Sequence, residues 1–222
     1  MGIKKGQSIR RASTYHHGDL RGALVRAAEQ LLEMHGAAGL SLREAAKLAG
    51  VSHAAPYRHF RSKSQLLEAV AKAGFERLTA SIETVRDDYP GDPVKQLMAA
   101  GQSYVEWAIA NPQRTRLMYG GMMKSASIPD DLYESAESAY QAIYQVMDEG
   151  RRLNIFAGDD TDTMVVSAWS LVHGLTMLLL GSSKLDPAGP DDVKELVHTI
   201  CRTILYGICD RGQHDGGITV DD

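Results

Sequence analysis

Residues 40–67, LSLREAAKLAGVSHAAPYRHFRSKSQLL, decide the fold of the first third of the chain. Ser41 and Glu44 form a capping box, a pair of residues that satisfies free amides at the start of a helix. Small apolar residues recur at helical spacing after Ser41, which predicts a short helix with one narrow apolar face. Gly50 can adopt the left-handed conformation that ends such a helix, and Val51 can fill the corner behind it.

Two further helix starts follow within the same stretch. Ser52 is placed to cap a second helix over residues 53–59, where Pro56 is tolerated near the first turn because its missing amide matters little there. Ser62 and Gln65 form a second capping box and predict a third helix. Two short helices joined at a glycine turn are typical of a helix-turn-helix. Spacing alone leaves a helical enzyme open as the alternative.

The residues themselves closely resemble the DNA-binding domain of the tetracycline-repressor (TetR) family. The resemblance is dense from about Asp19 to Phe75, and a shorter match to the family's WHG-type C-terminal subgroup lies at residues 169–174, WSLVHG. It implies a transcriptional regulator, a repressor, that binds a near-palindromic operator as a dimer and is released by a small-molecule effector. The matching positions run in one register: Gly39 to Ala46, Ala49 to Ser52, Tyr57 to Phe60, Lys63, Leu66 and Leu67.

The first turn of the second helix is the candidate base-reading element. An α-helix fits the major groove of duplex DNA, and its amino-terminal residues reach the base edges. His53 can donate or accept a hydrogen bond there, and the methyl groups of Ala54 and Ala55 can contact a thymine methyl. The segment His-Ala-Ala-Pro departs from the commoner forms of the family, so the operator sequence does not follow from it.

Phosphate contacts are assigned by the resemblance. It implies them for Tyr57 and His59, and for Lys63 at the start of the next helix, while Arg43 matches a position that reaches a base or the backbone. Tyr57 and Phe60 have an alternative role as core aromatics; we favour the phosphate for Tyr57 and the core for Phe60. The predicted DNA-binding residues are Arg43, Ser52, His53, Ala54, Ala55, Tyr57, Arg58, His59 and Lys63.

Charge is divided unevenly along the chain. The net charge of −4 argues against a nucleic-acid partner, but residues 1–77 hold 13 Lys and Arg against 6 Asp and Glu, while the remaining residues hold 11 against 22. A basic module joined to an acidic one fits a protein that contacts phosphates at one end only. The alternative is that the uneven distribution of charge reflects only a basic tail and chance, and has no connection with DNA.

Length and composition indicate a globular all-α protein. The 222 residues are 44 % hydrophobic and 23 % charged, and apolar residues recur at helical rather than alternating spacing. We expect a basic disordered arm (1–17), the helix-turn-helix domain (18–77), a helical ligand-binding and dimerisation domain (78–211) and a polar tail (212–222). The arm either contacts DNA through its Lys and Arg residues or serves only as a solubilising tail.

Methionine and aromatic residues gather in the second domain. Such residues can line an adaptable apolar pocket, although each is more often plain core, and for His173 we favour a buried, hydrogen-bonded histidine over a ligand contact. The predicted partner for the pocket is a small apolar or aromatic effector. The candidate ligand-binding residues are Tyr104, Trp107, Met118, Met122, Tyr140, Tyr144, Trp169 and His173.

The last two predicted helices, over residues 162–180 and 191–208, are the most apolar. Pairing them with their copies predicts a four-helix interface in a homodimer. Polar residues interrupt the run 164–180, which is also too short for a membrane span, so we expect a buried helix and no membrane partner.

Enzyme chemistry is not indicated. Cys201 and Cys209 lie eight residues apart, which suits neither a local disulfide nor a metal site, and we expect buried or interface thiols in a reducing cytoplasm. No phosphate-binding loop or hydrolase motif appears, so we predict no catalytic residue, no metal and no cofactor. The interpretation is a cytoplasmic, nucleoid-associated regulator; the alternative is a DNA-binding or architectural protein with no small ligand, whose second domain only dimerises.

Overall fold

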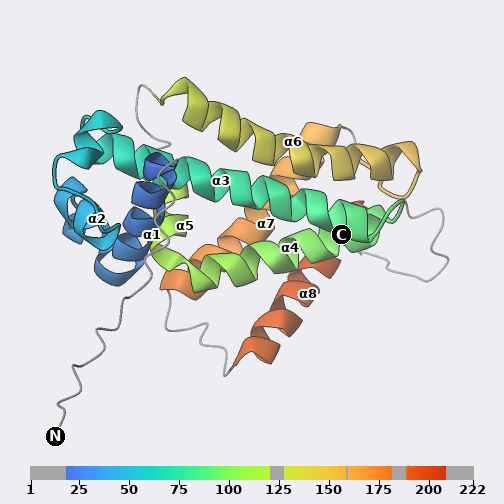
Figure 1. Cartoon of the computed structure of the whole chain (residues 1–222). Helices are drawn as coiled ribbons and strands as arrows, with labels where there is room; N and C mark the ends of the chain where they lie inside the picture. Colours follow the sequence, from blue (N-terminus) through green and yellow to red (C-terminus); the bar gives the residue numbers. More distant parts are fainter. Residues whose placement is uncertain (1–18, 121–127, 159, 182–188, 209–222) are drawn as a thin grey trace, which may run out of the picture.

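The computed structural model describes residues 19–120, 128–158, 160–181 and 189–208, and its elements are helices (Figure 1). The predicted all-α class is confirmed. The arm over residues 1–17, the tail, Met122 and Cys209 lie outside the described residues. In chain order the elements are α1 (Leu20–Gly39), α2 (Leu42–Leu48), the 3₁₀ helix η1 (Ala55–Arg58), α3 (Lys63–Asp88), α4 (Pro93–Ala110), α5 (Pro112–Tyr119), α6 (Asp130–Arg152), α7 (Thr161–Gly181) and α8 (Pro190–Ile208).

The predicted caps form at the starts of α2 and α3. The Oγ atom of Ser41 accepts a hydrogen bond from the Glu44 amide at 3.1 Å, and the Oγ atom of Ser62 accepts one from the Gln65 amide at 3.2 Å. The Gln65 side chain in turn accepts from the backbone amide of Arg61 at 2.8 Å. Each cap satisfies amides that would otherwise lack a partner, so the sequence alone places both helix starts.

Gly50 ends α2 as predicted. Its φ is +70°, the left-handed region that side chains rarely adopt. Val51 donates its amide to Ala46 at 3.0 Å and Gly50 donates to Lys47 at 3.2 Å, which is the hydrogen-bond pattern of a Schellman motif. The chain therefore reverses sharply enough for α2 and the following segment to share one core.

We call residues 19–77 the head, at the left of Figure 1, and residues 78–208 the body. The head has its own core, in which α1 covers α2 and the first turns of α3. Phe60 is only 2 % exposed and packs in this core, which is the role that the sequence favoured for it. The remaining buried members of the cluster are Leu24, Val25, Ala27, Ala28, Leu31, Leu32, Leu40, Leu42, Ala45, Leu66, Ala69 and Val70.

One helix, α3, runs from the head into the body, and α6 lies beside it (Figure 1). A small cluster that includes Phe75, Met118 and Leu132 joins α3 to α5 and α6 at the boundary of the two parts. A Cβ atom at Gly74 would lie 2.4 Å from the Met118 Sδ atom, so a larger residue there would require the Met118 side chain to move. The head and the body are therefore packed directly against each other along α3.

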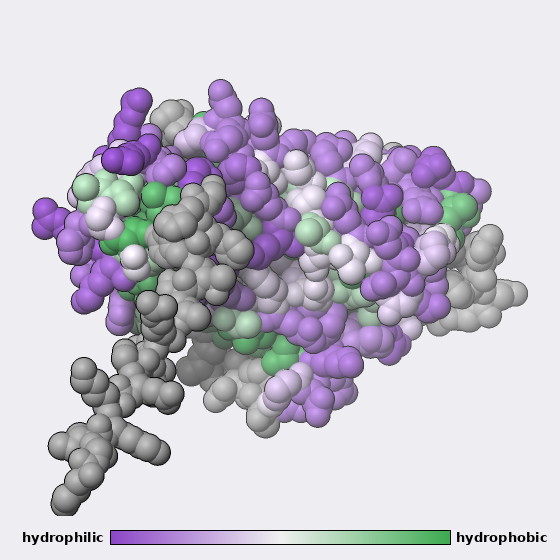
Figure 2. Space-filling model, viewed as in Figure 1, coloured by the Kyte–Doolittle hydropathy of each residue, from purple (hydrophilic) through white to green (hydrophobic). Residues whose placement is uncertain are grey.

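The expectation that residues 164–180 form a buried helix is only partly right. α7 has a mean hydropathy of 1.7 over its most apolar window, long and apolar enough for a membrane span, yet only 33 % of that window is buried. One face packs on the body core, whereas Val166, Leu171, Met177 and Leu178 on the other faces are exposed. Figure 2 shows a mainly hydrophilic surface over α3 and α6, with small groups of hydrophobic residues on the head, at the opposite end and on the lower side, where Figure 1 draws α7 and α8. Within the described chain, α7 is therefore covered on one side only.

Candidate DNA interface and effector cavity

The second element of the helix-turn-helix differs from the predicted helix over residues 53–59. It is a turn at His53 and Ala54 followed by the four-residue 3₁₀ helix η1, and its N-cap is Ala54 rather than Ser52. Pro56 explains the difference, because an α-helix capped by Ser52 would take its first hydrogen bond from the amide of residue 56. Proline has no amide hydrogen. The Ser52 carbonyl instead accepts a hydrogen bond from the amide of Ala55, three residues later, at 3.0 Å, which is the pattern of a 3₁₀ helix.

The predicted base-reading and phosphate-binding side chains lie on the outside of the head. Arg43 on α2 is exposed, as are Ser52, His53 and Ala54 in the turn, while Ala55 is half-buried. This arrangement leaves the segment free to approach a partner, which burial beneath the body would have prevented.

The residues of η1 that follow are also exposed. Tyr57 is 53 % exposed, and Arg58 and His59 are exposed beside it. Pro56, in contrast, is buried against the head, so the 3₁₀ turn is anchored on one side and displays polar side chains on the other. The exposure of Tyr57 contradicts its alternative role as a core aromatic.

Lys63 has a contact that the sequence did not reveal. Its Nζ atom donates a hydrogen bond to the carbonyl of Ala38 at 3.3 Å, near the carboxyl end of α1, and the residue is half-buried. A cation at a helix carboxyl end stabilises the helix dipole. The predicted phosphate contact of Lys63 therefore stands beside a structural role.

The body contains a cavity, partly open to the surface, with a volume of about 320 Å³; α3, α4, α6 and α7 supply most of its lining, and α5 and α8 supply one residue each. This volume lies in the range of small-molecule pockets, and its lining is almost entirely apolar. The lining residues are Phe75, Leu78, Ile82, Leu97, Ala100, Gly101, Tyr104, Tyr119, Ala136, Ala139, Tyr140, Ile143, Val165, Val166, Ala168, Trp169, Val172 and Cys201.

A chain of aromatic polar groups forms one end of this cavity. The hydroxyl of Tyr104 lies 2.8 Å from Nδ1 of His173, and His173 stacks on Trp169 with ring centroids 4.7 Å apart. Burial raises the pKa of Tyr104 despite hydrogen bonds from Tyr119 and Thr176, which lower it. Burial also raises the pKa of Tyr119 and lowers that of His173, so all three groups are uncharged near neutral pH.

Four of the eight predicted ligand residues belong to this site. Tyr104, Tyr140 and Trp169 line the cavity, and His173 supports it through Tyr104, as a buried, hydrogen-bonded histidine does. Tyr144 packs against the body core outside the cavity, and Met122 is not among the described residues.

Trp107 and Met118 were assigned wrongly to the cavity lining. Met118 is fully buried between α3 and α5, and the Arg114 guanidinium lies 5.7 Å from the Trp107 ring centroid. The sequence missed Tyr119 and the apolar residues of α3, and nothing in their spacing distinguishes a cavity wall from ordinary core. Cys201 is buried in the lining, as expected of a buried thiol, and burial raises its pKa to about 11.

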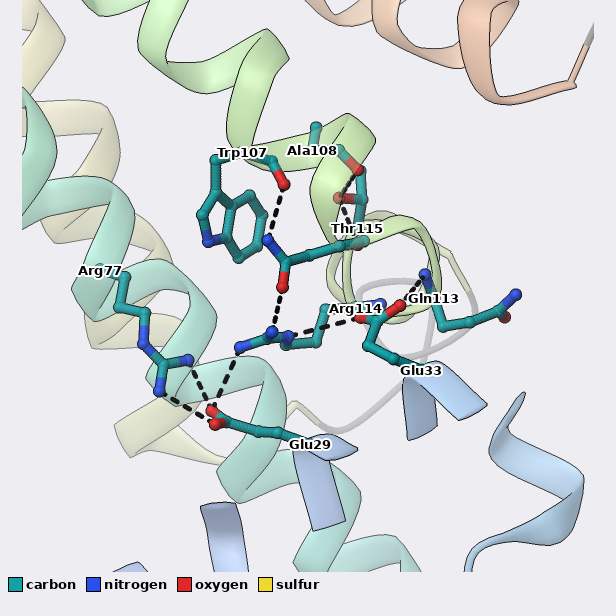
Figure 3. A network of polar contacts seen from close by, with 9 residues as sticks. Glu29, Glu33, Arg77, Trp107, Ala108, Gln113, Arg114 and Thr115 are labelled. Carbon is teal, nitrogen blue, oxygen red and sulfur yellow. Dashed lines mark hydrogen bonds and ion pairs between the residues drawn. The ribbon is translucent and has the colours of Figure 1, made fainter. Parts of the chain in front are cut away.

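A polar network joins α1 of the head to α3 and, across the boundary with the body, to α5 (Figure 3). Glu29 of α1 is 7 % exposed and accepts two hydrogen bonds from Arg77 of α3, at 2.5 and 3.0 Å. Glu33 of α1 accepts the backbone amides of Gln113 and Arg114, both at 3.0 Å, and so caps the start of α5 from another helix. The Arg114 side chain also pairs with both carboxylates. Because α5 ends at Tyr119 in the cavity, one short helix joins the cavity wall to the head.

Two family models match the chain over ranges that coincide with these parts. Residues 24–70 match bacterial regulatory proteins of the tetR family, and residues 97–204 match the tetracyclin repressor-like C-terminal domain. The chain belongs to the TetR family. It is a TetR-family transcriptional regulator, and this family binds DNA, typically dimerises and is not a class of enzymes.

Individual relatives agree with this assignment. A helix-turn-helix transcriptional regulator of Mycobacterium tuberculosis is 35 % identical over 103 residues, which are 46 % of this chain and 44 % of that protein. The chain therefore spans less than half the length of these curated relatives. The nucleoid occlusion factor SlmA of Vibrio cholerae is 28 % identical over 132 residues, 58 % of this chain and 67 % of that protein.

A solved structure extends the similarity to the whole described fold. A protein of unknown function from Rhodococcus sp. RHA1 is 33 % identical, with 89 % of this chain and 100 % of that chain covered and a TM-score of 0.79. The arrangement of head and body is thus shared with that structure beyond the two ranges that the family models match.

Proposed function

We propose that this protein is a cytoplasmic repressor that binds a near-palindromic operator as a homodimer and leaves it when a small molecule fills the body cavity. The observation that carries the proposal is the course of α3. Lys63 begins this helix beside the exposed η1 segment, and Phe75, Leu78 and Ile82 further along the same helix line the cavity. One rigid element thus connects the surface that faces DNA with the cavity wall.

The head supplies the DNA contacts. His53 and the neighbouring alanines read base edges in the major groove, and Tyr57, His59 and Lys63 hold the phosphates. The free amides at the start of α3 favour a phosphate there.

Dimerisation uses the uncovered faces of α7 and α8. The exposed apolar residues Leu171, Met177 and Leu178 on α7, with Tyr206 on α8, would be buried against a second copy. Two heads then occupy half-sites about one turn of DNA apart. Sedimentation analysis tests this step: the native chain should be dimeric, and Leu178→Glu should shift it towards the monomer. A monomeric native chain would contradict the proposal.

Release from DNA requires an effector that binds more tightly to the conformation in which the two heads no longer fit their half-sites. The loss of DNA affinity cannot exceed the ratio of the effector's affinities for the two conformations. Two routes lead from the cavity to the head: α3 itself, and α5 through Glu33 and Arg114. The cavity favours this interpretation over a body that only dimerises, which would be packed solid.

The similarity to SlmA supports a second candidate, a DNA-binding protein of the nucleoid with no small ligand. The two candidates differ in sequence preference and in response to small molecules. Footprinting of the region around the coding gene, followed by gel shifts with the protected duplex and a random duplex, separates them. Equal affinity for both duplexes would favour the second candidate.

Three variants test the assignment of the DNA contacts. His53→Ala should lower operator affinity about tenfold and leave binding to random duplex unchanged. Tyr57→Phe should weaken binding to both duplexes alike, and Lys63→Ala should do so with a salt dependence reduced by about one phosphate. Thermal unfolding of Lys63→Ala controls for its bond to Ala38. If His53→Ala weakens both duplexes equally, His53 is not a base-reading residue.

A further inference from the structure

The described residues that line the body cavity carry no charged side chain. The carboxylate of Asp162, near the lining residue Tyr140, accepts a hydrogen bond from the hydroxyl of that tyrosine. An ionised ligand inside the cavity would lose its hydration without gaining a partner of opposite charge, which is a large free-energy cost. The lining therefore selects against carboxylates, phosphates and ammonium groups.

The aromatic rings do not form an open cage for a cation. The ring of His173 lies flat on Trp169, at an interplanar angle of 11°, and Tyr119 meets Phe75 edge-on with centroids 5.5 Å apart. Tyr119 also packs on Trp169 at 4.9 Å. Because the rings cover one another, few faces remain for a quaternary ammonium group to occupy.

Tyr104 and Tyr119 supply hydroxyl groups at one end of the cavity lining. Tyr104 is 5 % exposed; its hydroxyl lies 2.8 Å from Nδ1 of His173, and the Tyr119 and Thr176 side chains lie beside it. A neutral imidazole can accept the Tyr104 proton or donate its own, depending on its tautomer. Tyr119 also lines the cavity, and its hydroxyl can both donate and accept a hydrogen bond. A ligand hydroxyl suits either role, because it also donates and accepts.

The volume sets the size of the occupant. A dry apolar cavity of about 150 Å³ binds benzene. The present cavity of about 320 Å³ is roughly twice as large, which matches two fused rings.

We infer that the effector is an uncharged, mostly apolar molecule of about two fused rings that places a single hydroxyl-type group against Tyr119 and Tyr104. This inference rests on the proposed function only in calling the ligand an effector. Binding itself involves the body and not DNA.

Equilibrium dialysis of the full chain, without DNA, tests the inference with four probes of matched size. They are 2-naphthol, naphthalene, 2-naphthoate and trimethyl(2-naphthyl)ammonium, each quantified by its absorbance. We expect 2-naphthol to bind up to about tenfold more tightly than naphthalene, as one added hydrogen bond allows, and both charged probes to bind at least tenfold more weakly than 2-naphthol. A charged probe that binds as tightly as 2-naphthol, or no binding by either neutral probe, would overturn the inference.

Tyr119→Phe locates the polar group, because it removes one oxygen and keeps the ring. This variant should bind 2-naphthol and naphthalene within about twofold of each other, whereas the control Tyr133→Phe, at an exposed tyrosine outside the cavity, should keep the preference of the native chain. Should Tyr119→Phe unfold, Tyr104→Phe provides the same comparison. An unchanged preference in the folded variant would refute the hydroxyl contact.

A separate gel shift with the operator keeps the two proposals apart. If 2-naphthol binds in dialysis but does not weaken the DNA complex, the inference about the class of ligand is supported. The proposal that this ligand releases the protein from DNA is then contradicted.

Discussion

The head and the body both present tyrosine and histidine side chains, and they place them in opposite environments. On the head, Tyr57 is 53 % exposed and His53 and His59 lie in solvent. In the body, Tyr104 is 5 % exposed and is bonded to the partly buried His173. In the functions proposed above, the same residue types contact a charged polymer at one end of the molecule and a neutral ligand at the other, because burial decides which partners they can reach.

The two parts also differ in how they are held. The head depends on a compact local core in which Phe60 is central, so its fold follows from residues close in sequence. The described lining of the cavity comes from six helices, α3 to α8, between residue 75 and residue 201. Mutations in the head and mutations in the body should therefore have effects that can be told apart.

The largest expected effect on the free energy of unfolding comes from Phe60, which follows η1, in comparison with Tyr57 inside η1. Phe60→Ala removes a buried ring from the head core and should lower the free energy of unfolding by about 3–5 kcal/mol. Tyr57→Ala, three residues earlier but exposed, should change it by less than about 0.5 kcal/mol while weakening DNA binding. Urea unfolding followed by circular dichroism measures the first quantity and gel shifts the second. Equal losses of stability would mean that Tyr57 belongs to the core after all.

An intermediate effect is expected at the junction of Figure 3. Glu29→Ala leaves Arg77 and Arg114 without a shared carboxylate; because Arg77 is 44 % exposed and water can solvate it, we expect a loss of about 2 kcal/mol rather than the larger value of a fully buried pair. Asp148→Ala, at a partly exposed carboxylate 3.2 Å from Arg152, is the matched control and should have little effect. The same unfolding experiment compares them. Identical behaviour of the two variants would show that the junction does not hold the head to the body.

The smallest effect concerns the pH dependence of the body. Burial lowers the pKa of His173, so the folded chain binds this proton less readily than the unfolded chain, where the pKa is about 6.5. The neutral imidazole of His173 therefore contributes fully to the free energy of unfolding above about pH 6.5. This contribution is lost as the pH falls through the lower pKa that His173 has in the folded chain. The adjacent Tyr104 and Tyr119 stay neutral throughout, because their pKa values are raised. His173→Gln should flatten the fall of the urea midpoint between about pH 7 and 5; an equally steep fall in the variant would exclude His173 as its source.

Local signals in the sequence predicted most of the helices. Ser41, Gly50 and Ser62 act on amides and carbonyls a few residues away, so their effects need no tertiary information. The predicted ranges of the last two helices, 162–180 and 191–208, agree with α7 and α8 to within one residue at each end. The 3₁₀ form of η1 was missed although its cause, the absent amide of Pro56, is also local.

The cavity was predicted far less well. Tyr104, Tyr140 and Trp169 were found because aromatic residues stand out, but Met118 looked the same in sequence and is ordinary core. The apolar residues of α3 and α4 that line the cavity are spaced like those that fill the core. Whether a side chain meets a neighbour or an empty volume depends on helices far away in the chain.

The sequence by itself determined where most helices begin and end, which turn joins them and which end of the chain is basic, because these properties depend on neighbours along the backbone. Only the tertiary structure decided that Glu33 caps a helix some 80 residues away, that His173 meets Tyr104, and that a space remains between α3, α4, α6 and α7. The physical reason is that packing and burial are set by distances in space, which spacing along the chain does not contain.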